Sequence, residues 1–487
     1  MSKRQMTNMT VGSPAKHILK FALPLLVGNL FQQLYNMVDS MVVGNFVGSD
    51  ALAAVGTCGS TNFLFFSLSS GLAIGIGVIV SQFYGADDDE NVRATIANSF
   101  YVLSAAALTV SIVGFLTAPA ILQLLRVPDS ILPSSVLYMR TTCMGILGIA
   151  TYNGVSSILR ALGDSRTPLY FLILSSLVNV VLDLTFVLGL GLGVFGVALA
   201  TVIAQFISAI SCLAYAYLKV PYFQLTREEL KPHGKIIARS FKLGVPIALQ
   251  SSMIAVSCMA LQGVVNGFGE TVMAAYTVTA RIEQLVQQPY SSLSSAVTTY
   301  SGQNIGAGNV NRVRKGFRQA VVMVLVFSLA MIPVMYLGGE SLVRLFVKDN
   351  EETVRIAVRA LRITSLCYFG LGMIYVPRGL MNGCGDAAFS MINGLSEVAG
   401  RLAFAQIFTR IPAIGFWGVW LTTGATWVST GVVCLIRYFQ GAWKNKAITG
   451  KRQAEAKEED APGRNAIYRR NAQKRQRIIC AKSTKML

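Results

Sequence analysis

Two acidic side chains of this sequence lie in stretches that are otherwise apolar. Asp183 follows Asn179 by four residues in "SLVNVVLDLTFVLG", a spacing that places an amide and a carboxylate on one helix face. Asp39 lies in "LYNMVDSMVVG", and Thr201 supplies a hydroxyl from the next apolar stretch. Carboxylate, amide and hydroxyl oxygens form a hard site suited to H⁺ or Na⁺. Burial and mutual repulsion favour the protonated form of a carboxyl group, so such a pair can load and release a proton near neutral pH.

Further ionisable side chains lie in apolar stretches of the second half. Glu397 and Arg401 are four residues apart and can neutralise each other along one helix face. Arg281 and Glu283 are two residues apart and cannot face the same way. Glu283 is therefore either a second cation site or a partner of Arg401, and the sequence leaves both open.

The stretches that carry these residues are long enough to cross a membrane. The chain is 53% hydrophobic and only 13% charged, against about 25% charged for soluble proteins. Apolar runs of the length that spans a bilayer recur throughout, and no alternating barrel pattern is present, so we predict membrane helices. They cover 16–43, 52–83, 93–118, 133–158, 167–189, 194–219, 238–266, 271–301, 318–338, 354–377, 388–410 and 415–440. An acid in such a helix costs about 2.5–3.5 kcal/mol and is functional by default, the alternative being a polar cluster that only joins helices.

The second half of the sequence repeats the first. "FALPLLVGNL" parallels "FKLGVPIALQ", which places Pro24 opposite Pro246, and "SQFYGADDDENVR" parallels "GQNIGAGNVNRVR". The predicted fold is all-α and integral to the membrane, with twelve transmembrane helices in two pseudo-symmetric six-helix bundles. Residues 1–218 form the first lobe, 219–235 a cytoplasmic loop, 236–441 the second lobe, and 442–487 a basic cytoplasmic tail that we expect to be disordered.

The repeat also indicates a mode of action. Six spans per half return the chain to its starting side, so the two halves run parallel about an axis along the membrane normal. Two like bundles enclose a cleft that rocking exposes to either side, as in a carrier of the alternating-access type. Asp39 aligns with Leu261 and Asp183 with Ala405, so the acids belong to one half and the fold does not require them.

The distribution of charge predicts the orientation. Most of the 42 Lys and Arg fall in segments on the side of the N-terminus, which the positive-inside rule assigns to the cytoplasm together with the C-terminus. The expected location is the cytoplasmic membrane, with contacts to lipid, and the net charge of +19 does not indicate nucleic acid. No cleavable signal peptide is visible.

Catalytic and metal-binding patterns are missing from the sequence. The eight cysteines are scattered singly, and both histidines, His17 and His233, lie outside the predicted spans. None of the HExxH, GxSxG and GxxxxGK[ST] motifs occurs. We therefore predict no enzyme, no cofactor and no metal other than Na⁺ as a coupling ion. A membrane-embedded hydrolase is the rival from another class.

Several motifs together resemble the multidrug and toxic compound extrusion (MATE) family. They are "PLLVGNLFQQLYNMVDSMVVGNFVG", "GDSRTP", "GVFGVALAT" and "GQNIGAGN", and the likeness runs from about residue 14 to 441. The paired acids of the first lobe are similar to the DinF-type branch. There the resemblance implies a coupling-ion site for H⁺ or Na⁺ made of Asp39, Asn153, Asn179, Asp183 and Thr201. It also implies that Gln32, Tyr35 and the kink-forming Pro24 belong to the cavity of the first lobe that contains this site.

The resemblance implies a monomeric antiporter that exports organic cations or amphipathic drugs in exchange for H⁺ or Na⁺. Residues 361–377 lack the acid that the NorM-type pattern carries there, which disfavours a NorM-like ion site in the second lobe. Aromatic and acidic side chains would attract soft cations, and we expect Gln32, Tyr35, Tyr152, Glu283 and Arg401 to line the substrate cavity. The prolines 24 and 246 are candidate hinges or static kinks. A flippase or scramblase for lipid-linked or other amphipathic substrates is the leading alternative.

Overall fold

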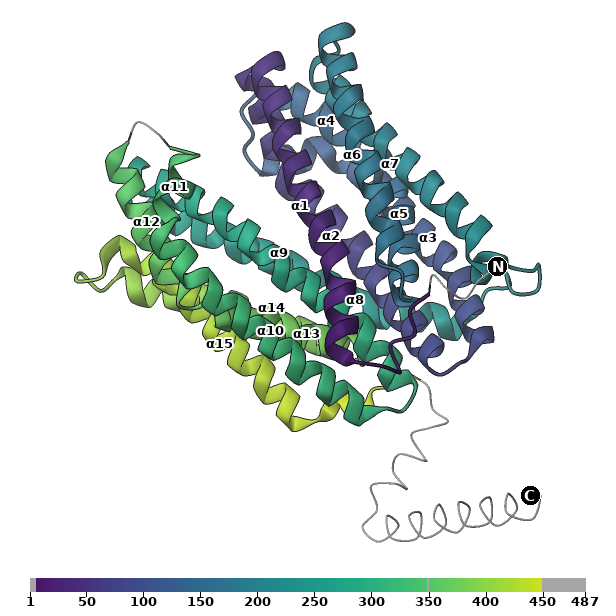
Figure 1. Ribbon diagram of the computed structural model, residues 1–487. Helices are drawn as coiled ribbons and strands as arrows, with labels where there is room; N and C mark the ends of the chain where they lie inside the picture. The colour runs from purple at the N-terminus through teal and green to yellow at the C-terminus, as the bar shows by residue number, and fades with distance from the viewer. Residues whose placement is uncertain (1–5, 348–349, 449–487) are drawn as a thin grey trace, which may run out of the picture.

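The computed structural model describes residues 6–347 and 350–448, and within them the chain is helical with no strands. Two groups of helices form arms that diverge toward one end of the molecule and meet near the start of α1 (Figure 1). We call the end that carries residues 6–13 and 446–448 the terminal end. Most of the predicted tail, from residue 449 on, lies outside the described residues.

The first arm is the N-terminal lobe. It consists of α1 (Pro14–Val42), the π-helical turn η1 (Val43–Val47), α2 (Ser49–Gly85), α3 (Asp89–Leu124), α4 (Leu132–Met144), α5 (Ile146–Ala161), α6 (Arg166–Leu184), a second π-helical turn η2 (Thr185–Gly189) and α7 (Gly193–Lys219). A short 3₁₀ turn, η3 (Pro221–Phe223), follows in the connection to the second arm.

The C-terminal lobe repeats this order. It consists of α8 (Gly234–Asn266), α9 (Glu270–Gly306), α10 (Val310–Leu337), the short α11 (Gly339–Arg344), α12 (Glu351–Ser365), α13 (Tyr368–Gly383), α14 (Ala387–Thr409), η4 (Gly415–Trp417), α15 (Gly418–Gln440) and η5 (Ala442–Asn445). The pairs α4–α5 and α12–α13 are each one predicted span, bent by 42° and 52°. Counted in this way, the described residues contain the twelve predicted spans in two repeated halves.

Membrane crossing is supported for most of these spans by length and composition alone. Among the described residues, seven helices are long and apolar enough to cross, or nine when each bent pair counts as one span. The three remaining spans are α1, α9 and α14, which carry Asp39, Glu283 and the pair Glu397–Arg401. These three spans bear most of the ionisable side chains singled out by the sequence, and Asp183 of α6 is the exception.

Local sequence signals explain where several helices begin and turn. The Asp88 side chain accepts a hydrogen bond from the Asn91 N–H and caps the start of α3, as acidic N-caps do. Gly163 and Gly385 end α5 and α13 with φ of +93° and +89°, a left-handed conformation that favours glycine. The aspartate after Gly163 caps the next helix, because Asp164 Oδ1 accepts the Thr167 N–H at 3.1 Å.

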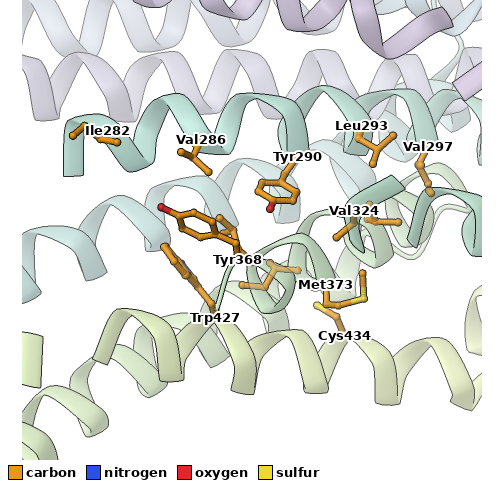
Figure 2. Close-up of a cluster of buried hydrophobic side chains, with 14 of the residues drawn as sticks. Ile282, Val286, Tyr290, Leu293, Val297, Val324, Tyr368, Met373, Trp427 and Cys434 are labelled. Atoms are coloured by element: carbon orange, nitrogen blue, oxygen red, sulfur yellow. The ribbon is translucent and has the colours of Figure 1, made fainter. Parts of the chain in front are cut away.

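The core of the C-terminal lobe lies between α9, α10, α13 and α15. Figure 2 shows its side chains, among them Tyr290, Tyr368, Met373 and Trp427, facing one another from these helices. The buried Tyr290 hydroxyl pairs with Ser328 Oγ of α10 at 2.7 Å, so the ring is packed without leaving its polar end unpaired. This core supports one wall of the cavity described below.

The two lobes meet along α2, α8 and α9, and small residues allow their backbones to touch. A Cβ atom on Gly75 would lie 2.7 Å from the Gly244 nitrogen. A Cβ on Gly85 would overlap the backbone oxygen of Gln303, and Gly306 is packed in the same way against Gln82. Such contacts leave no room for any side chain, so the lobes are tightly closed at the terminal end.

Hydrogen bonds between the lobes are concentrated at this same end. Gln82 Nε2 donates to the Gly383 carbonyl at 2.8 Å, and Gln303 Nε2 donates to the Ala161 carbonyl at 2.8 Å. Farther along α2 the last such bond in the described chain joins Ser67 to Ser252, at 2.9 Å. From there the arms separate (Figure 1), so the interface is closed on one side only.

Candidate functional site

The N-terminal lobe brings its two acids together. Asp39 lies near the end of α1, and Asp183 near the end of α6, which packs against α1. Their carboxyl groups are within hydrogen-bonding contact of each other. Two carboxylates this close repel each other, so the pair favours holding a proton on one of its members. The structure thus brings the two acids together, and their role as a coupling site stays a prediction.

Asn179 and Thr201 orient the second acid. With the amide placed to satisfy its neighbours, Asn179 donates to Asp183 Oδ2 at 3.1 Å and accepts from the Thr201 N–H at 3.2 Å. Asn179 and Asp183 are each only 1% exposed. The amide therefore locks one carboxylate oxygen in place, and the predicted i, i+4 pair does share one helix face.

Each acid also has an oxygen without a partner. Asp39 Oδ1 and Asp183 Oδ1 are buried, and no hydrogen bond reaches them from the described side chains or backbone. An unsatisfied buried acceptor costs about 1–3 kcal/mol, and more when it is charged. A proton or a small hard cation that binds there satisfies the free oxygens and removes that cost, so the site favours binding one.

Two tyrosines face the pair of acids. Tyr35 lies one turn before Asp39 on α1, contacts Thr201, and interacts electrostatically with both carboxyl groups. Tyr138 of α4 is 8% exposed and interacts with the same two acids. The sequence analysis found Tyr35 but missed Tyr138, because a tyrosine in an apolar span carries no signal that separates it from packing aromatics.

A π-helical turn follows each acid. η1 begins four residues after Asp39, and η2 begins two residues after Asp183, and the two turns contact each other. Their repeat counterparts at the ends of α8 and α14 have no such turn within the described chain. π-Turns are rare and recur at functional sites. Their presence in only one lobe matches the one-sided distribution of the acids.

The remaining predicted residues of this lobe are less closely gathered. Gln32 lies on the face of α1 that also carries Tyr35 and Asp39. Asn153 of α5 has a buried Nδ2 with no partner in the described structure, so no hydrogen bond from this amide nitrogen reaches the acids. Tyr152 donates to the Pro168 carbonyl at 2.9 Å and packs within the lobe rather than beside Glu283.

The two predicted hinge prolines do not interrupt their helices. Pro24 lies inside α1 and Pro246 inside α8, and both helices continue through them. Each proline removes one backbone donor and weakens its helix locally. A hinge at these positions stays a prediction.

A second polar region lies within the C-terminal lobe. Glu283 and Arg401 line a cavity of about 310 Å³ there, together with Glu397 and Arg378. Arg401 forms an ion pair with Glu397 at 3.1 Å, so the two side chains neutralise each other as one of the sequence alternatives foresaw. The predicted substrate residues are thus divided between the lobes, with Glu283 and Arg401 in one and Gln32, Tyr35 and Tyr152 in the other.

Comparisons with known proteins agree with this architecture. Residues 24–185 and 246–405 match the family model described as MatE, one match in each lobe. The "Probable multidrug resistance protein YpnP" of Bacillus subtilis (strain 168) is 29% identical over 439 residues, 90% of this chain and 97% of that protein. The "Probable multidrug resistance protein YoeA" of the same organism is 27% identical over 437 residues, with 88% and 94% covered.

Solved structures with the same fold are also found. One is described as the outward-facing conformation of a multidrug resistance MATE family transporter of the MOP superfamily. It superposes with a TM-score of 0.85 at 23% identity, covering 91% of this chain and all of that one. At this identity the likeness supports the fold, which is the predicted pair of six-helix bundles.

Proposed function

Because this chain belongs to the MatE family of multidrug efflux transporters, we propose that it exports organic cations or amphipathic drugs across the cytoplasmic membrane in exchange for H⁺ or Na⁺. The family is one of multi-pass membrane transporters and not of enzymes, in agreement with the sequence. The coupling ion, the class of substrate and the orientation belong to the proposal.

The observation that carries the proposal is the buried pair Asp39–Asp183. The two carboxyl groups lie close together, and each keeps one buried oxygen without a partner in the described structure, which supports exchange of H⁺ or binding of Na⁺ by the pair. Taking up an ion changes the charge of the site, and a charge in a membrane helix is costly. Loading and release therefore change the relative stability of conformations that bury or hydrate the pair, which is what coupling requires.

The arrangement of the lobes supports alternating access. With the terminal end in the cytoplasm, as the positive-inside rule predicts, the lobes are closed toward the cytoplasm and diverge toward the outside. An outward-facing state exposes the acids to the side from which an ion would enter. Ion binding would then favour return to the inward-facing state that collects the drug.

A transport assay with imposed gradients tests the proposal. Purified protein in liposomes loaded with a fluorescent cationic dye should move the dye against its gradient when a pH or Na⁺ gradient is imposed, and should stop when the gradient is collapsed by an ionophore. Dye movement that is indifferent to both gradients would contradict coupled antiport. Movement of fluorescent lipid between leaflets without any ion gradient would instead identify a flippase or scramblase.

A further inference from the structure

The cavity of the C-terminal lobe contains charges of both signs. Glu283 comes from α9, Arg378 from α13, and Glu397 and Arg401 from α14, around a volume of about 310 Å³. This volume is at the lower end of the range of small-molecule sites, roughly 300–1,000 Å³. The equivalent positions of the first repeat hold neutral residues, namely Asn62, Ser156, Ser175 and Asn179. The charges are therefore not a requirement of the shared fold.

Two of these charges neutralise each other. Arg401 Nη2 donates to Glu397 Oε1 at 3.1 Å, and both side chains are only 7% exposed. A second nitrogen of the Arg401 guanidinium, Nη1, donates to the Cys258 sulfur at 2.6 Å. This pair is a fixed part of the wall and offers little net charge to a ligand.

Neither of the other two charges forms an ion pair among the described residues. Arg401 acts on Glu283 electrostatically, but its guanidinium is already paired with Glu397. Glu283 is 8% exposed, and its Oε1 is buried without a hydrogen-bond partner in the described chain. The Arg378 guanidinium stacks over the Tyr375 ring at 4.5 Å and forms none of the ion pairs found among the described residues. The cavity therefore presents one carboxyl group and one guanidinium that are each free to bind a group of opposite charge.

The walls between these two groups are aromatic. Tyr276, Tyr375 and Trp427 line the cavity with the side chains of Gln284 and Gln287. The Tyr375 hydroxyl is held by Gln287 Oε1 at 3.2 Å, which fixes its ring beneath Arg378. Such rings bind flat apolar groups and cations, while the amides accept or donate hydrogen bonds.

We propose that this cavity binds a zwitterionic aromatic amphiphile, with the ligand carboxylate on Arg378 and the ligand ammonium on Glu283. The inference rests on the proposed transport function and names a substrate class for it. A ligand with a single positive charge would leave Arg378 without a counterion, and a ligand with a single negative charge would leave Glu283 without one. Only a ligand with both charges satisfies the buried Glu283 and the half-buried Arg378, and leaving the buried carboxyl group unpaired is costly.

A charge-matched series of dipeptides tests the inference. The three probes are tryptophyl-phenylalanine, which is zwitterionic, its C-terminal amide, which is cationic, and its N-acetyl form, which is anionic. Isothermal titration calorimetry on the purified full-length protein should show the zwitterion binding at least about ten-fold more tightly than either of the other two, since one charge-assisted contact contributes about 1.5–3 kcal/mol. Equal affinity for all three would overturn the proposal.

Two variants assign each contact to its residue. Arg378→Gln should abolish the preference for the zwitterion over the amide and keep the preference over the N-acetyl form. Glu283→Gln should abolish the preference for the zwitterion over the N-acetyl form and keep the preference over the amide. If either residue only supports the fold, its substitution would weaken the binding of all three ligands equally. That result would contradict the inference.

A control and a second assay separate this inference from the proposed function. Arg281→Gln, on the same helix but exposed and outside the cavity, should leave all three affinities unchanged. Selective binding of the zwitterion without ion-driven dye export would contradict the proposed antiport and support this site. Ion-driven dye export with equal binding of the three dipeptides would contradict this site and support antiport.

Discussion

Gln82 and Gln303 occupy equivalent positions of the two repeats and make equivalent hydrogen bonds across the lobe interface. Each donates from Nε2 to a backbone carbonyl at the end of a helix in the opposite lobe, at 2.8 Å. The acceptors, Gly383 and Ala161, are themselves equivalent positions. The closed interface is therefore built twice, once from each repeat, about the pseudo-twofold axis.

The side-chain oxygen of each glutamine binds one end of the described chain. Gln303 Oε1 accepts the Met9 N–H at 2.9 Å, and Gln82 Oε1 accepts the Ile448 N–H at 2.7 Å. Both side chains are fully buried. Opening the terminal end must break all four bonds, so the two chain segments are part of the closure.

Removing either glutamine should favour opening at the terminal end. Gln82→Ala or Gln303→Ala eliminates two hydrogen bonds of about 0.5–1.5 kcal/mol each, which together shift the equilibrium by about 5- to 150-fold. Hydrogen–deuterium exchange should then be faster in peptides that contain the turns at Gly163 and Gly385. Gln250→Ala is the matched control, because Gln250 bonds to Asn393 within one lobe, at 2.7 Å. Faster exchange in the control alone would argue against the closure.

The tight glycine packing leads to a second prediction. Gly85→Ala would place a methyl group on the backbone of Gln303, which cannot move aside as a flexible side chain can. We expect the variant to insert normally, yet to lose dye export because the terminal end no longer closes. Gly56→Ala on the same helix meets nothing within 4 Å and should export normally. Equal export by both variants in the liposome assay would show that close contact at Gly85 is dispensable.

Neutralising the paired acids should uncouple transport. Asp39→Asn and Asp183→Asn keep the shape of each side chain and remove its charge change, so each should abolish gradient-driven dye export while the protein stays folded. The double variant should be little worse than either single one, because the residues act as one unit. Leu261→Met and Ala405→Ser alter the repeat equivalents and should preserve export. Normal export by both Asn variants would identify the pair as a purely structural contact.

The inter-lobe loop should respond to acid. The Thr226 N–H donates to Glu229 at 2.7 Å, and this bond, the Thr226 hydroxyl and Arg93 lower the pKa of that carboxyl. A depressed folded-state pKa stabilises the loop above the unfolded value of about 4.3, and the gain is lost as pH falls through the folded pKa. Exchange of the 224–233 peptide, corrected for its intrinsic pH dependence, should therefore accelerate below about pH 4.3. Glu229→Gln should exchange fast even at pH 7, and a pH-independent wild type would contradict the expectation.

Much of this architecture could be predicted from the sequence because the membrane imposes strong patterns. Twelve long apolar runs and a repeated set of motifs define the spans and their order, and the i, i+4 spacing of Asn179 and Asp183 places them on one face. The cost of an acid in lipid singled out Asp39 as well, and the family resemblance implied that it shares a site with Asp183. The same spacing rule foresaw the contact of Glu397 with Arg401.

Other features depend on tertiary contacts, and no local sequence pattern indicates them. The bend between α4 and α5 falls at Gly145, where a Cβ atom would lie 2.6 Å from the Gln205 side chain, so packing against α7 selects it. The π-turns after Asp39 and Asp183 lie in ordinary apolar sequence. Tyr138 comes near the acids only through the packing of α4 within the lobe, and no periodicity of α4 predicts that.

The bond between Gln82 and Ile448 has a consequence for biosynthesis. The two residues are 366 positions apart, and a ribosome that adds about 5–20 residues per second needs roughly 20 to 70 s to pass from one to the other. Once α7 has been made, the first lobe waits for the rest of that interval with its half of the closure unpaired. A nascent chain therefore cannot form a sealed transporter until its last helix has been released, and premature termination within the second lobe would leave an unsealed bundle for membrane quality control to remove.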